Sequence, residues 1–443
     1  MKKIIILFFA LILFSQCIQA KSVKSEVLHI INDSGIKKDS IAVSIRNAKD
    51  GKTVYSLNDS IMMNPASVQK VLTMTAAEQT LGQGYKFSTE LYSEGENNYL
   101  IKLSGDPYLR YSELKALTKS VKLGAENVFI DDNILDKKYW GEGWQWDDDM
   151  NTLMPKFGAY NLDKNLIKLQ ILPSEKGKFA TIVNPSKYPF VFMNNIKNSD
   201  KTSVDITREP SISDNTLILN GTVSRQTTVY IPSENIKRYF EIQLTRALGE
   251  NKIYLKNPFV VKTKSKNDKL ENKIEHELSY AMSDILKNSN NMAAETVFKL
   301  AGGKFINGVG TDTSGIDMFN DFCAKQNLDS STIRITDGSG VSKNNLLTAG
   351  FVSEFLYKNK NSHAMQYLPC PGEGTLAQRL LPIKNNLRAK TGTLSNISSI
   401  AGFITSKSGH EYTFCILQND VKLSPSDKKM LEDYILREIY LKL

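Results

Sequence analysis

The stretch Pro65-Ala66-Ser67-Val68-Gln69-Lys70, followed by the apolar run Val71-Leu72-Thr73-Met74, decides how the rest of this sequence is interpreted. Pro65 has a helix-compatible φ and no N–H to leave unpaired, so we expect a helix to begin here. Ser67 then lies in the first turn, and Lys70 shares a face with it. A serine hydroxyl becomes a nucleophile when a base takes its proton, and a partly buried lysine of lowered pKa can be that base. Taken alone, the spacing also fits a capping serine beside a surface lysine.

Two distant stretches support the catalytic interpretation. Ser289-Asn290-Asn291 falls in a break between two helical patterns, and Lys390-Thr391-Gly392-Thr393 opens a strand-like run. S-x-x-K, S-x-N and K-T-G, in this order, form the motif set of the penicillin-recognising serine acyl-transferases. Each motif is weak singly, but the ordered triple is specific.

Residues 1–20 predict a cleaved secretory signal and therefore a periplasmic or otherwise extracytoplasmic location. Lys2 and Lys3 form a charged start, an apolar run follows, and Ile18-Gln19-Ala20 is a suitable cleavage site. The run is short for a bilayer span, which needs about 18 apolar residues or more. Cys17 raises a lipoprotein alternative, but Gln16 before it is a poor lipobox residue. We expect a soluble exported enzyme with at most peripheral membrane association.

The composition limits the classes of partner and cofactor that we expect. Removal of residues 1–20 takes away two lysines and no acids, so the formal net charge falls from +9 to +7. This modest basicity suits an acidic partner such as the cell-wall polymer, and it equally suits plain solubility. No cluster of basic residues with interleaved aromatics indicates nucleic acid. An odd number of cysteines follows the signal (Cys323, Cys370 and Cys415), so we predict no disulfide framework. The four histidines lack ligand spacing, which predicts no metal or other cofactor and disfavours a Ser–His–Asp triad.

Both ends of the chain carry strand and helix patterns. Asp50-Gly51 predicts a hairpin turn between the strand patterns Ile41–Ile45 and Thr53–Leu57, and Gly82 is a suitable end for the helix of the first motif. Near the other end, three strand-like runs precede a helix that opens at Ser424-Pro425; the runs are Leu387–Thr393, Ser399–Thr405 and Tyr412–Leu417. These ends, enclosing a central helical cluster, predict an α+β domain assembled from both ends of the chain.

Residues from about 84 to 265 have a different character. Short β-like runs are separated by turn residues such as Asn184-Pro185 and Asn220-Gly221, and a helical pattern lies between Ser233 and Gly249. The runs are Tyr99–Leu103, Val128–Ile130, Lys168–Leu172, Val204–Thr207 and Thr216–Leu219. We interpret this region as inserted material between the first catalytic motif and the other two.

The segment 140–149 holds all three tryptophans of the chain beside three aspartates. One interpretation is a loop anchored by aromatic side chains with a solvated acidic tip. The other is a wall that recognises a cationic group of a ligand. Both interpretations stay open on the sequence alone.

The motif order and several further pieces resemble the penicillin-binding-protein-4 type of D-alanyl-D-alanine carboxypeptidase/endopeptidase, a low-molecular-mass class C penicillin-binding protein. The pieces are Asn64-Pro65-Ala66-Ser67, Gly105-Asp106-Pro107, Gly143-Trp144-Gln145-Trp146-Asp147-Asp148, Asp337-Gly338-Ser339-Gly340 and Gly374-Thr375-Leu376. The likeness covers nearly all of the chain after the signal. Asp337–Gly340 lacks the glycine of a nucleophile elbow two residues before the serine, so we predict a tight turn there.

The resemblance implies a penicillin-recognising (β-lactamase/transpeptidase-like) domain interrupted by nested, β-rich inserted domains. We expect the main domain at 21–83 and 266–443, one inserted domain at 84–160 and 228–265, and a second at 161–227. Two departures stand out. Asn290 replaces a frequent aspartate, and Met154-Pro155-Lys156-Phe157 departs from a tendency towards tyrosine in a region that helps to hold the amino group of the peptide's diamino acid.

The resemblance also implies the roles of the residues. Ser67 attacks the carbonyl of the penultimate D-alanine with Lys70 as base, Ser289 relays a proton to the leaving amine, and Lys390 supplies positive potential. The residues implied to bind substrate are Asn291, Thr391, Gly392, Thr393, Trp146 and Asp148. The partners implied are peptidoglycan stem peptides, with β-lactams as covalent inhibitors that acylate Ser67.

Two alternatives remain open. A β-lactam-hydrolysing enzyme would share all three motifs, although no deacylating glutamate is identifiable and the insertion is long for that class. A non-catalytic wall-binding or sensor protein could retain the fold, although Ser67, Lys70, Ser289 and Lys390 are all intact.

Overall fold

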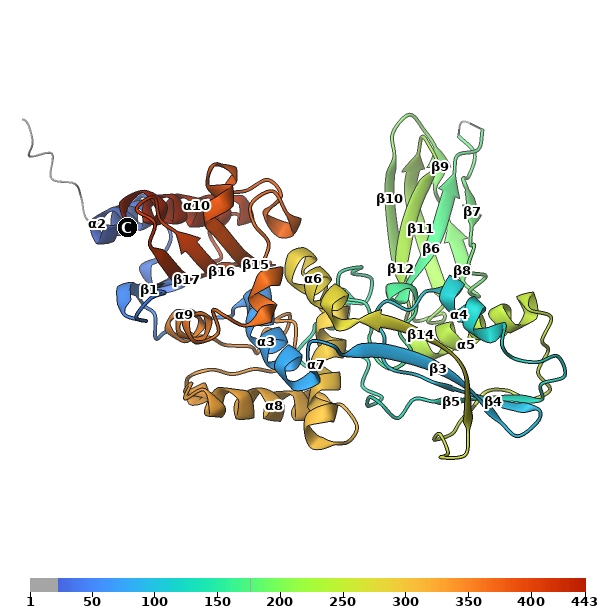
Figure 1. The fold of residues 1–443 in the computed structure, drawn as a ribbon. Helices are drawn as coiled ribbons and strands as arrows, with labels where there is room; N and C mark the ends of the chain where they lie inside the picture. Colours follow the sequence, from blue (N-terminus) through green and yellow to red (C-terminus); the bar gives the residue numbers. More distant parts are fainter. Residues whose placement is uncertain (1–22, 176) are drawn as a thin grey trace, which may run out of the picture. The chain divides into compact units, whose positions relative to one another are not determined.

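The computed structural model describes residues 23–175 and 177–443, so the predicted signal segment and Cys17 lie outside the described residues (Figure 1). The described chain forms two compact units. The first contains residues 23–63, 348–360 and 369–443, and the second contains residues 64–347 and 361–368. The boundaries expected for the nested domains stay a prediction.

The first unit is built on one five-stranded sheet in the order β15-β16-β17-β1-β2. Its strands are β1 (Ile41–Asn47), β2 (Thr53–Leu57), β15 (Leu387–Leu394), β16 (Ile397–Thr405) and β17 (Glu411–Asn419). All neighbours are antiparallel, and β1 lies beside β17 with Ile41 opposite Gln418. This pairing confirms that both ends of the chain build one sheet.

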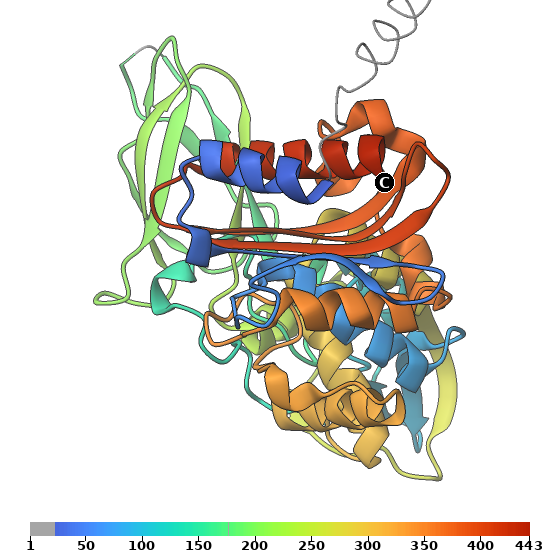
Figure 2. The ribbon, with the colours of Figure 1, turned by 90° about the vertical axis from the view of Figure 1, so that its left-hand side faces the viewer.

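Helices cover both faces of this sheet. α2 (Val23–Asp33) and α10 (Pro425–Lys442) lie side by side over one face, and α9 (Ala349–Lys358) lies under the other (Figure 2). Both faces must be covered because β16 and β17 are buried along almost their whole length. As predicted, the last helix begins after Ser424, whose hydroxyl accepts the N–H of Asp427.

The second unit contains a helical cluster of α3 (Gln69–Leu81), α6 (Leu278–Asn288), α7 (Asn291–Ile306) and α8 (Asp312–Lys325). α3 and the first three turns of α7 are buried nearly all round, which makes them its centre. α7 and α8 approach closely at a glycine, because a Cβ on Gly302 would lie 2.3 Å from the backbone nitrogen of Gly315. α3 ends before Gly82, as predicted.

The region predicted as an insertion also belongs to the second unit, and it is rich in β-structure. One sheet has the order β13-β5-β4-β3-β14, another β12-β6-β7, and a third β10-β11-β8 with β9 beside β11. Helices α4 (Tyr111–Thr118) and α5 (Ile236–Glu250) pack against each other in this region. The strands are β3 (Lys86–Glu94), β4 (Asn98–Lys102), β5 (Asn127–Asp131), β6 (Leu166–Leu172), β7 (Thr181–Val183), β8 (Val191–Asn194), β9 (Lys197–Asn198), β10 (Ser203–Arg208), β11 (Thr216–Val223), β12 (Thr227–Pro232), β13 (Val260–Val261) and β14 (Lys269–Glu277).

The turn predicted at Asn220-Gly221 was wrong, because β11 runs straight through both residues. Gly221 has a φ of 117° and lies opposite Val204 of β10. A Cβ there would lie 1.9 Å from the carbonyl oxygen of Ser203. The glycine therefore allows the two strands to approach closely, rather than turning the chain.

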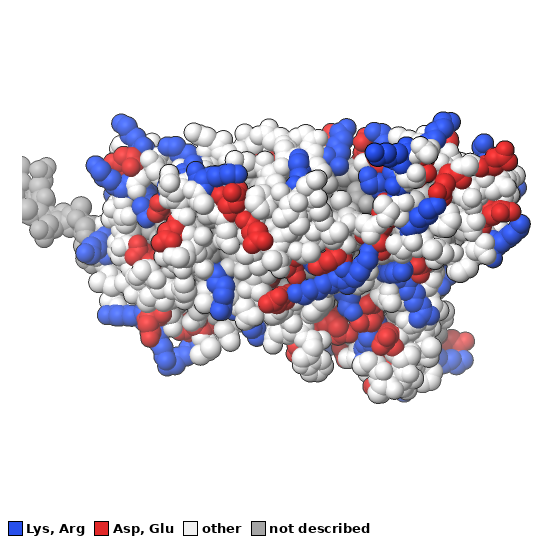
Figure 3. All heavy atoms as spheres, turned by 90° about the horizontal axis from the view of Figure 1, so that it is seen from below, with Lys and Arg blue, Asp and Glu red and all other residues white. Residues whose placement is uncertain are grey.

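Among the residues that the structure describes, no helix has both the length and the apolarity to cross a membrane. On the face drawn in Figure 3, lysine and arginine side chains are interspersed with aspartate and glutamate side chains.

Candidate active site

Ser67 lies in a short 3-10 turn, Ala66–Val68, that leads into α3. Ala66 has a φ of 45°, in the left-handed region that costs a residue with a side chain about 1–2 kcal/mol. Asn64 holds this strained residue from both sides: its Oδ1 accepts the N–H of Ala66 at 2.9 Å, and its Nδ2 donates to the carbonyl of Ser342 at 3.0 Å. The backbone just before the nucleophile is therefore fixed in one conformation.

Lys70 is completely buried, while Ser67 is partly exposed. The Nζ atom of Lys70 lies 2.9 Å from Ser67 Oγ, 2.6 Å from Asn291 Oδ1 and 2.6 Å from the carbonyl oxygen of Ser339. Burial lowers the pKa of Lys70 to about 7, against the opposing attraction of Asp337 and Glu295. A substantial fraction of Lys70 is therefore neutral near neutral pH.

These three contacts determine where the lone pair of a neutral Lys70 points. The amide oxygen of Asn291 and the carbonyl oxygen of Ser339 can only accept hydrogen bonds. A neutral amine has two hydrogens, so it donates them to these two oxygens. Its lone pair then faces Ser67, the one partner that can donate. The lone pair of Lys70 is therefore placed to accept the hydroxyl proton of Ser67.

The loop 337–342 encloses the amino-terminal part of α3, and Asp337 organises it. Its carboxylate accepts the backbone N–H groups of Gly340 and Ser342 at 2.7 and 2.6 Å, and Trp144 Nε1 donates to it at 3.0 Å. Gly340 is required for close packing, because a Cβ there would lie 2.1 Å from the carbonyl oxygen of Ala66. The tight turn predicted here is a buried support for the nucleophile segment.

Glu295 is a fully buried carboxylate on α7. Its two oxygens accept the backbone N–H groups of Gly338 and Ser339 at 2.9 and 2.8 Å. Burial, together with the nearby charge of Asp337, raises the pKa of Glu295 above its ordinary value. Because Ser339 is also the residue whose carbonyl contacts Lys70, Glu295 positions one of the three oxygens around the base.

Ser289 and Asn291 lie at the junction of two helices, as the sequence predicted. Ser289 caps the carboxyl end of α6 in a left-handed conformation with a φ of 63°. Asn290 caps the amino end of α7, where its Oδ1 accepts the N–H of Ala293 at 3.1 Å. The change from a frequent aspartate to Asn290 therefore retains a capping oxygen.

Both the oxygen and the nitrogen of the Asn291 side-chain amide form hydrogen bonds. Its Oδ1 contacts Lys70, which fixes the orientation of the amide, and its Nδ2 donates to the carbonyl of Leu153 at 2.9 Å. The amide nitrogen has a second hydrogen that this bond does not use, so a peptide substrate can bind there while the Leu153 contact remains.

The tryptophan segment has a buried part that anchors the loop and an exposed part, and its recognition of a cationic group stays a prediction. Trp144 is buried, and Trp140 packs on it edge to face at 5.1 Å, so both anchor the loop. Asp149 forms an ion pair with Arg208 at 3.0 Å. In contrast, Trp146 is 89% exposed, and Asp148 lies beside it in the same short turn with no buried residue. Trp146 and Asp148 remain accessible to a ligand.

The K-T-G motif lies on β15, the edge strand of the sheet in the first unit. Lys390 is buried, with its Nζ 2.7 Å from the carbonyl of Thr391. The hydroxyl of Thr391 donates to that of Thr375 at 2.7 Å, while Thr393 is exposed. An edge strand can pair with an extended peptide through its backbone, which suits a substrate-binding role.

The structure thus brings Ser67, Lys70 and Asn291 into direct contact, and it describes Lys390, Thr391, Gly392 and Thr393 on the other unit. Sequence reasoning missed the supporting roles of Asn64, Glu295 and Asp337. Glu295 did leave a signal, since it is a lone carboxylate within the apolar stretch Met292–Leu300. Among residues 23–175 and 177–443, no group of His, Cys, Asp and Glu is arranged to hold a metal ion.

Comparison with known proteins identifies the family. Residues 23–437 match the model of the D-Ala-D-Ala carboxypeptidase 3 (S13) family. The D-alanyl-D-alanine carboxypeptidase DacB of Haemophilus influenzae is 25% identical over 83% of this chain and 83% of its own length.

Solved structures share the fold. The crystal structure of penicillin binding protein 4 from Haemophilus influenzae has a TM-score of 0.82 at 23% identity, covering 94% of this chain and 99% of that one. Its complex with a novel β-lactam has a TM-score of 0.76 at 22% identity, with the same coverage. A predatory peptidoglycan endopeptidase from Bdellovibrio bacteriovorus reaches 0.51 at 15% identity, covering 90% of each chain.

The resemblance inferred from the motifs is confirmed, as is the penicillin-recognising α+β fold. The chain belongs to the D-Ala-D-Ala carboxypeptidase 3 (S13) family and is a serine-type carboxypeptidase.

Proposed function

We propose that this carboxypeptidase is exported, that it both trims D-alanine from peptidoglycan stem peptides and hydrolyses their cross-links, and that β-lactams acylate it. All three reactions would pass through one acyl-enzyme on Ser67. The observation that carries this proposal is the completely buried Lys70, whose Nζ lies 2.9 Å from Ser67 Oγ. A buried amine with a pKa of about 7 suits a base that works near neutral pH.

In the acylation step, Ser67 Oγ forms a bond to the carbonyl carbon of the penultimate D-alanine as Lys70 takes the hydroxyl proton. The C–N bond then breaks, and the proton passes to the leaving amine through Ser289. The leaving amine is free D-alanine in the carboxypeptidase reaction and the side-chain amine of a second stem peptide in the endopeptidase reaction. Water then attacks the ester, which releases the shortened peptide and restores the Ser67 hydroxyl.

The remaining motif residues would stabilise charge and hold substrate. The N–H groups of Ser67 and Thr393 would form the oxyanion hole, and such donors contribute on the order of 3 kcal/mol each in the transition state. Lys390, with the hydroxyls of Thr391 and Thr393, would attract the terminal carboxylate, and Gly392 permits close approach. Asn291 would bind the peptide backbone. Trp146 and Asp148, both accessible, would recognise the amino group of the diamino acid.

The endopeptidase and β-lactam components draw support from the structural neighbours. One neighbour is a predatory peptidoglycan endopeptidase, and another was solved with a bound β-lactam. Export draws support from the signal-like residues 1–20. Mass determination of the protein purified from a secreting host tests export, since cleavage after Ala20 gives an amino terminus at Lys21, whereas lipidation would occur at Cys17.

The decisive experiment compares the mature protein with its Ser67→Ala variant. Both are incubated with a fluorescent penicillin and, separately, with cross-linked muropeptides that are analysed by mass spectrometry. We expect the wild type to be labelled, to release D-alanine and to split cross-links, and the variant to do none of these. Labelling without peptide turnover would favour a sensor, and rapid hydrolysis of the penicillin would favour a β-lactamase. Absence of labelling would refute the acyl-enzyme on Ser67.

A further inference from the structure

A cavity of about 320 Å³ in the second unit shares a wall with the S-x-N motif. Ser289 and Asn291 line it on one side, and Leu153, Lys164, Tyr230 and Asp284 line it elsewhere. These residues come from the loop after the tryptophan segment, the turn before β6, strand β12 and helix α6. A peptide held by Asn291 therefore has part of its length next to this cavity.

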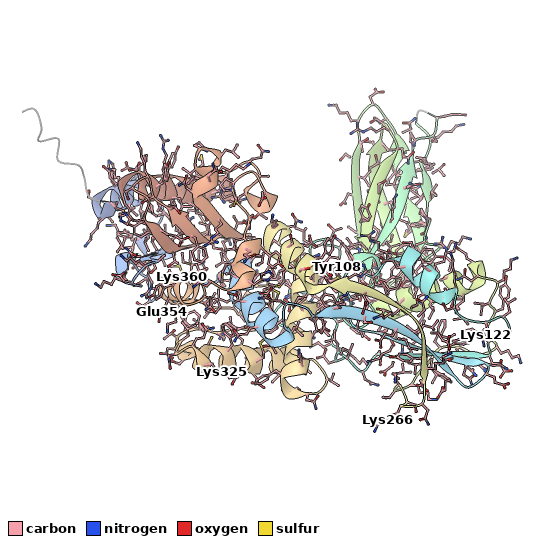
Figure 4. The ribbon with its side chains drawn as sticks, viewed as in Figure 1. Tyr108, Lys122, Lys266, Lys325, Glu354 and Lys360 are labelled. Carbon is pink, nitrogen blue, oxygen red and sulfur yellow. The ribbon has the colours of Figure 1, made fainter. Side chains whose placement is uncertain are left out.

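The two charged groups of the cavity differ in what they can still bind. Asp284 accepts hydrogen bonds from Asn288 at 2.9 Å, from Asn290 at 2.8 Å and from the hydroxyl of Tyr108 at 3.0 Å. Burial opposes its ionisation, but the hydrogen bonds from Asn288 and Asn290, together with the positive charge of Lys164 and the Tyr108 hydroxyl, outweigh this and lower the pKa of Asp284. Asp284 is thus an anion that already accepts three hydrogen bonds from the protein. Tyr108 lies close to α6 (Figure 4).

Lys164 forms an ion pair with Asp284, at a distance too long for a hydrogen bond. Its Nζ lies 3.8 Å from Asp284 Oδ2 and 6.0 Å from the ring centroid of Tyr108, and its side chain is 52% exposed. Within the described residues, no oxygen is close enough to accept a hydrogen bond from this ammonium group. The polar group that the cavity offers to a ligand is therefore a cation with its N–H groups available.

The position of Lys164 is fixed by its backbone. Asp163, Lys164 and Asn165 all have φ values between 50° and 57°, a run of left-handed residues that each cost about 1–2 kcal/mol. Asp163 accepts the N–H of Tyr111 and the hydroxyl of Tyr239, and Asn165 donates to the carbonyl of Lys156 at 2.7 Å. The folded protein therefore maintains an unfavourable turn whose middle residue presents its side chain at the cavity.

The apolar part of the wall suits the aliphatic portion of a peptide. Leu153 is 71% exposed and Tyr230 is 50% exposed, so a ligand in the cavity would cover apolar surface that is now in contact with water. A ligand that matches both features has a carboxylate for Lys164 and a short apolar chain for Leu153 and Tyr230.

We propose that this cavity is a subsite for a carboxylate of the stem peptide away from the scissile bond, with Lys164 as its binding cation. The inference rests on the proposed function of Ser67. The carboxylate can come from the strand that forms the acyl-enzyme or from the strand released when a cross-link is cut. In either case, Lys164 would favour the carboxylate form of the peptide over its amide.

The test uses synthetic stem peptides that end in D-Ala-D-Ala, with the internal carboxylate either free or amidated. It also uses cross-linked dimers that are amidated on one strand or the other. We expect wild type to prefer the free carboxylate by roughly fivefold in kcat/KM, a size typical of a partly exposed charged contact. Lys164→Ala should reduce this preference to near one, and Lys164→Arg should retain most of it. The dimers identify which strand supplies the group.

The matched control is Lys266→Ala, an exposed lysine on the loop before β14 and away from Tyr108 (Figure 4), which should retain the wild-type preference. Equal turnover of free and amidated peptides by wild type would overturn the subsite, as would an unchanged preference in Lys164→Ala. Loss of all turnover and of penicillin labelling in wild type would instead refute the proposed function, so the two failures are distinguishable.

Discussion

The carboxylate of Glu295 accepts a 2.8 Å hydrogen bond from the backbone N–H of Ser339. The carbonyl of the same Ser339 accepts a 2.6 Å hydrogen bond from Lys70. A buried carboxylate thus acts on the catalytic base through one intervening residue, and it also contributes negative potential at that base.

Glu295→Gln tests this positioning. The amide nitrogen cannot accept, so the N–H of Gly338 or Ser339 loses its partner, and we expect acylation by penicillin to slow about 10- to 100-fold. The lost negative charge no longer favours the ammonium form, so the pKa of Lys70 falls further. In a profile of the acylation rate measured from pH 5 to 9, the acidic limb (the rise of the rate with pH) should therefore move to lower pH.

The control for this variant is Glu432→Gln, which removes another completely buried carboxylate, one that is paired with Arg379 in the first unit. It should lower the melting temperature without moving the acidic limb. An unchanged limb in Glu295→Gln would contradict the electrostatic role, even if the rate falls.

Lys70 itself predicts the pH dependence of the wild type. Because the neutral amine is the base and its pKa is about 7, the acylation rate should rise with pH through about 7 and then level off. Lys70→Arg introduces a bulkier side chain that stays protonated and cannot act as a base, so we expect a loss of about 10²- to 10⁴-fold. Stopped-flow measurement with a chromogenic β-lactam checks both statements, and a rate independent of pH between 6 and 8 would exclude Lys70 as the titrating base.

Gly340→Ala should disturb the position of Ser67 without changing Ser67 itself. The added Cβ would lie 2.1 Å from the carbonyl oxygen of Ala66, and the φ of 81° is itself unfavourable for alanine. We expect a melting temperature lower by several degrees and acylation slower by about tenfold or more. Gly84→Ala is the matched control, since its Cβ would meet no atom within 4 Å. Equal effects of the two substitutions would show that Gly340 has no special role.

The surroundings of His276 predict that the stability of the folded protein depends on pH. Its hydrogen bond to Asp106, at 2.6 Å, and the nearby Glu113 raise the pKa of His276 above its ordinary value. A raised folded pKa stabilises the protein below the ordinary value near 6.5, and this contribution is lost as the pH rises through the folded value. His276→Gln should therefore lower the melting temperature more at pH 6 than at pH 8.5. His410→Gln, at an exposed position, is the control; an equal loss at both pH values in His276→Gln would contradict the linkage.

The sequence allowed prediction of the elements whose signals are local. The strands β1, β2, β15, β16 and β17 carry apolar runs bounded by turn residues, and the break before Asn291 is marked by polar residues between two helical patterns. Elements that depend on distant partners were missed. β14 has no fully buried residue and little apolar alternation, and it is a strand because it pairs with β3.

The same distinction applies to the site. The spacing of Ser67 and Lys70 predicted their contact, because three residues on a helix share a face. Glu295 and Asp337 could not be placed in this way, since their partners lie on segments tens to hundreds of residues away. The turn predicted at Asn220-Gly221 was wrong for a related reason. This dipeptide favours a turn, but the pairing of β11 with β10 outweighs that local preference.

The pairing of β1 with β17 determines when the first unit can fold. Ile41 must find Gln418, so the sheet closes only after nearly the whole chain has been synthesised. Until then, β1 can pair only with β2, and its other edge has no partner strand, whereas the intervening residues 64–347 can form their own contacts. The early apolar strand is therefore an aggregation hazard during biogenesis, and a chain truncated before β17 would lack the centre of the sheet.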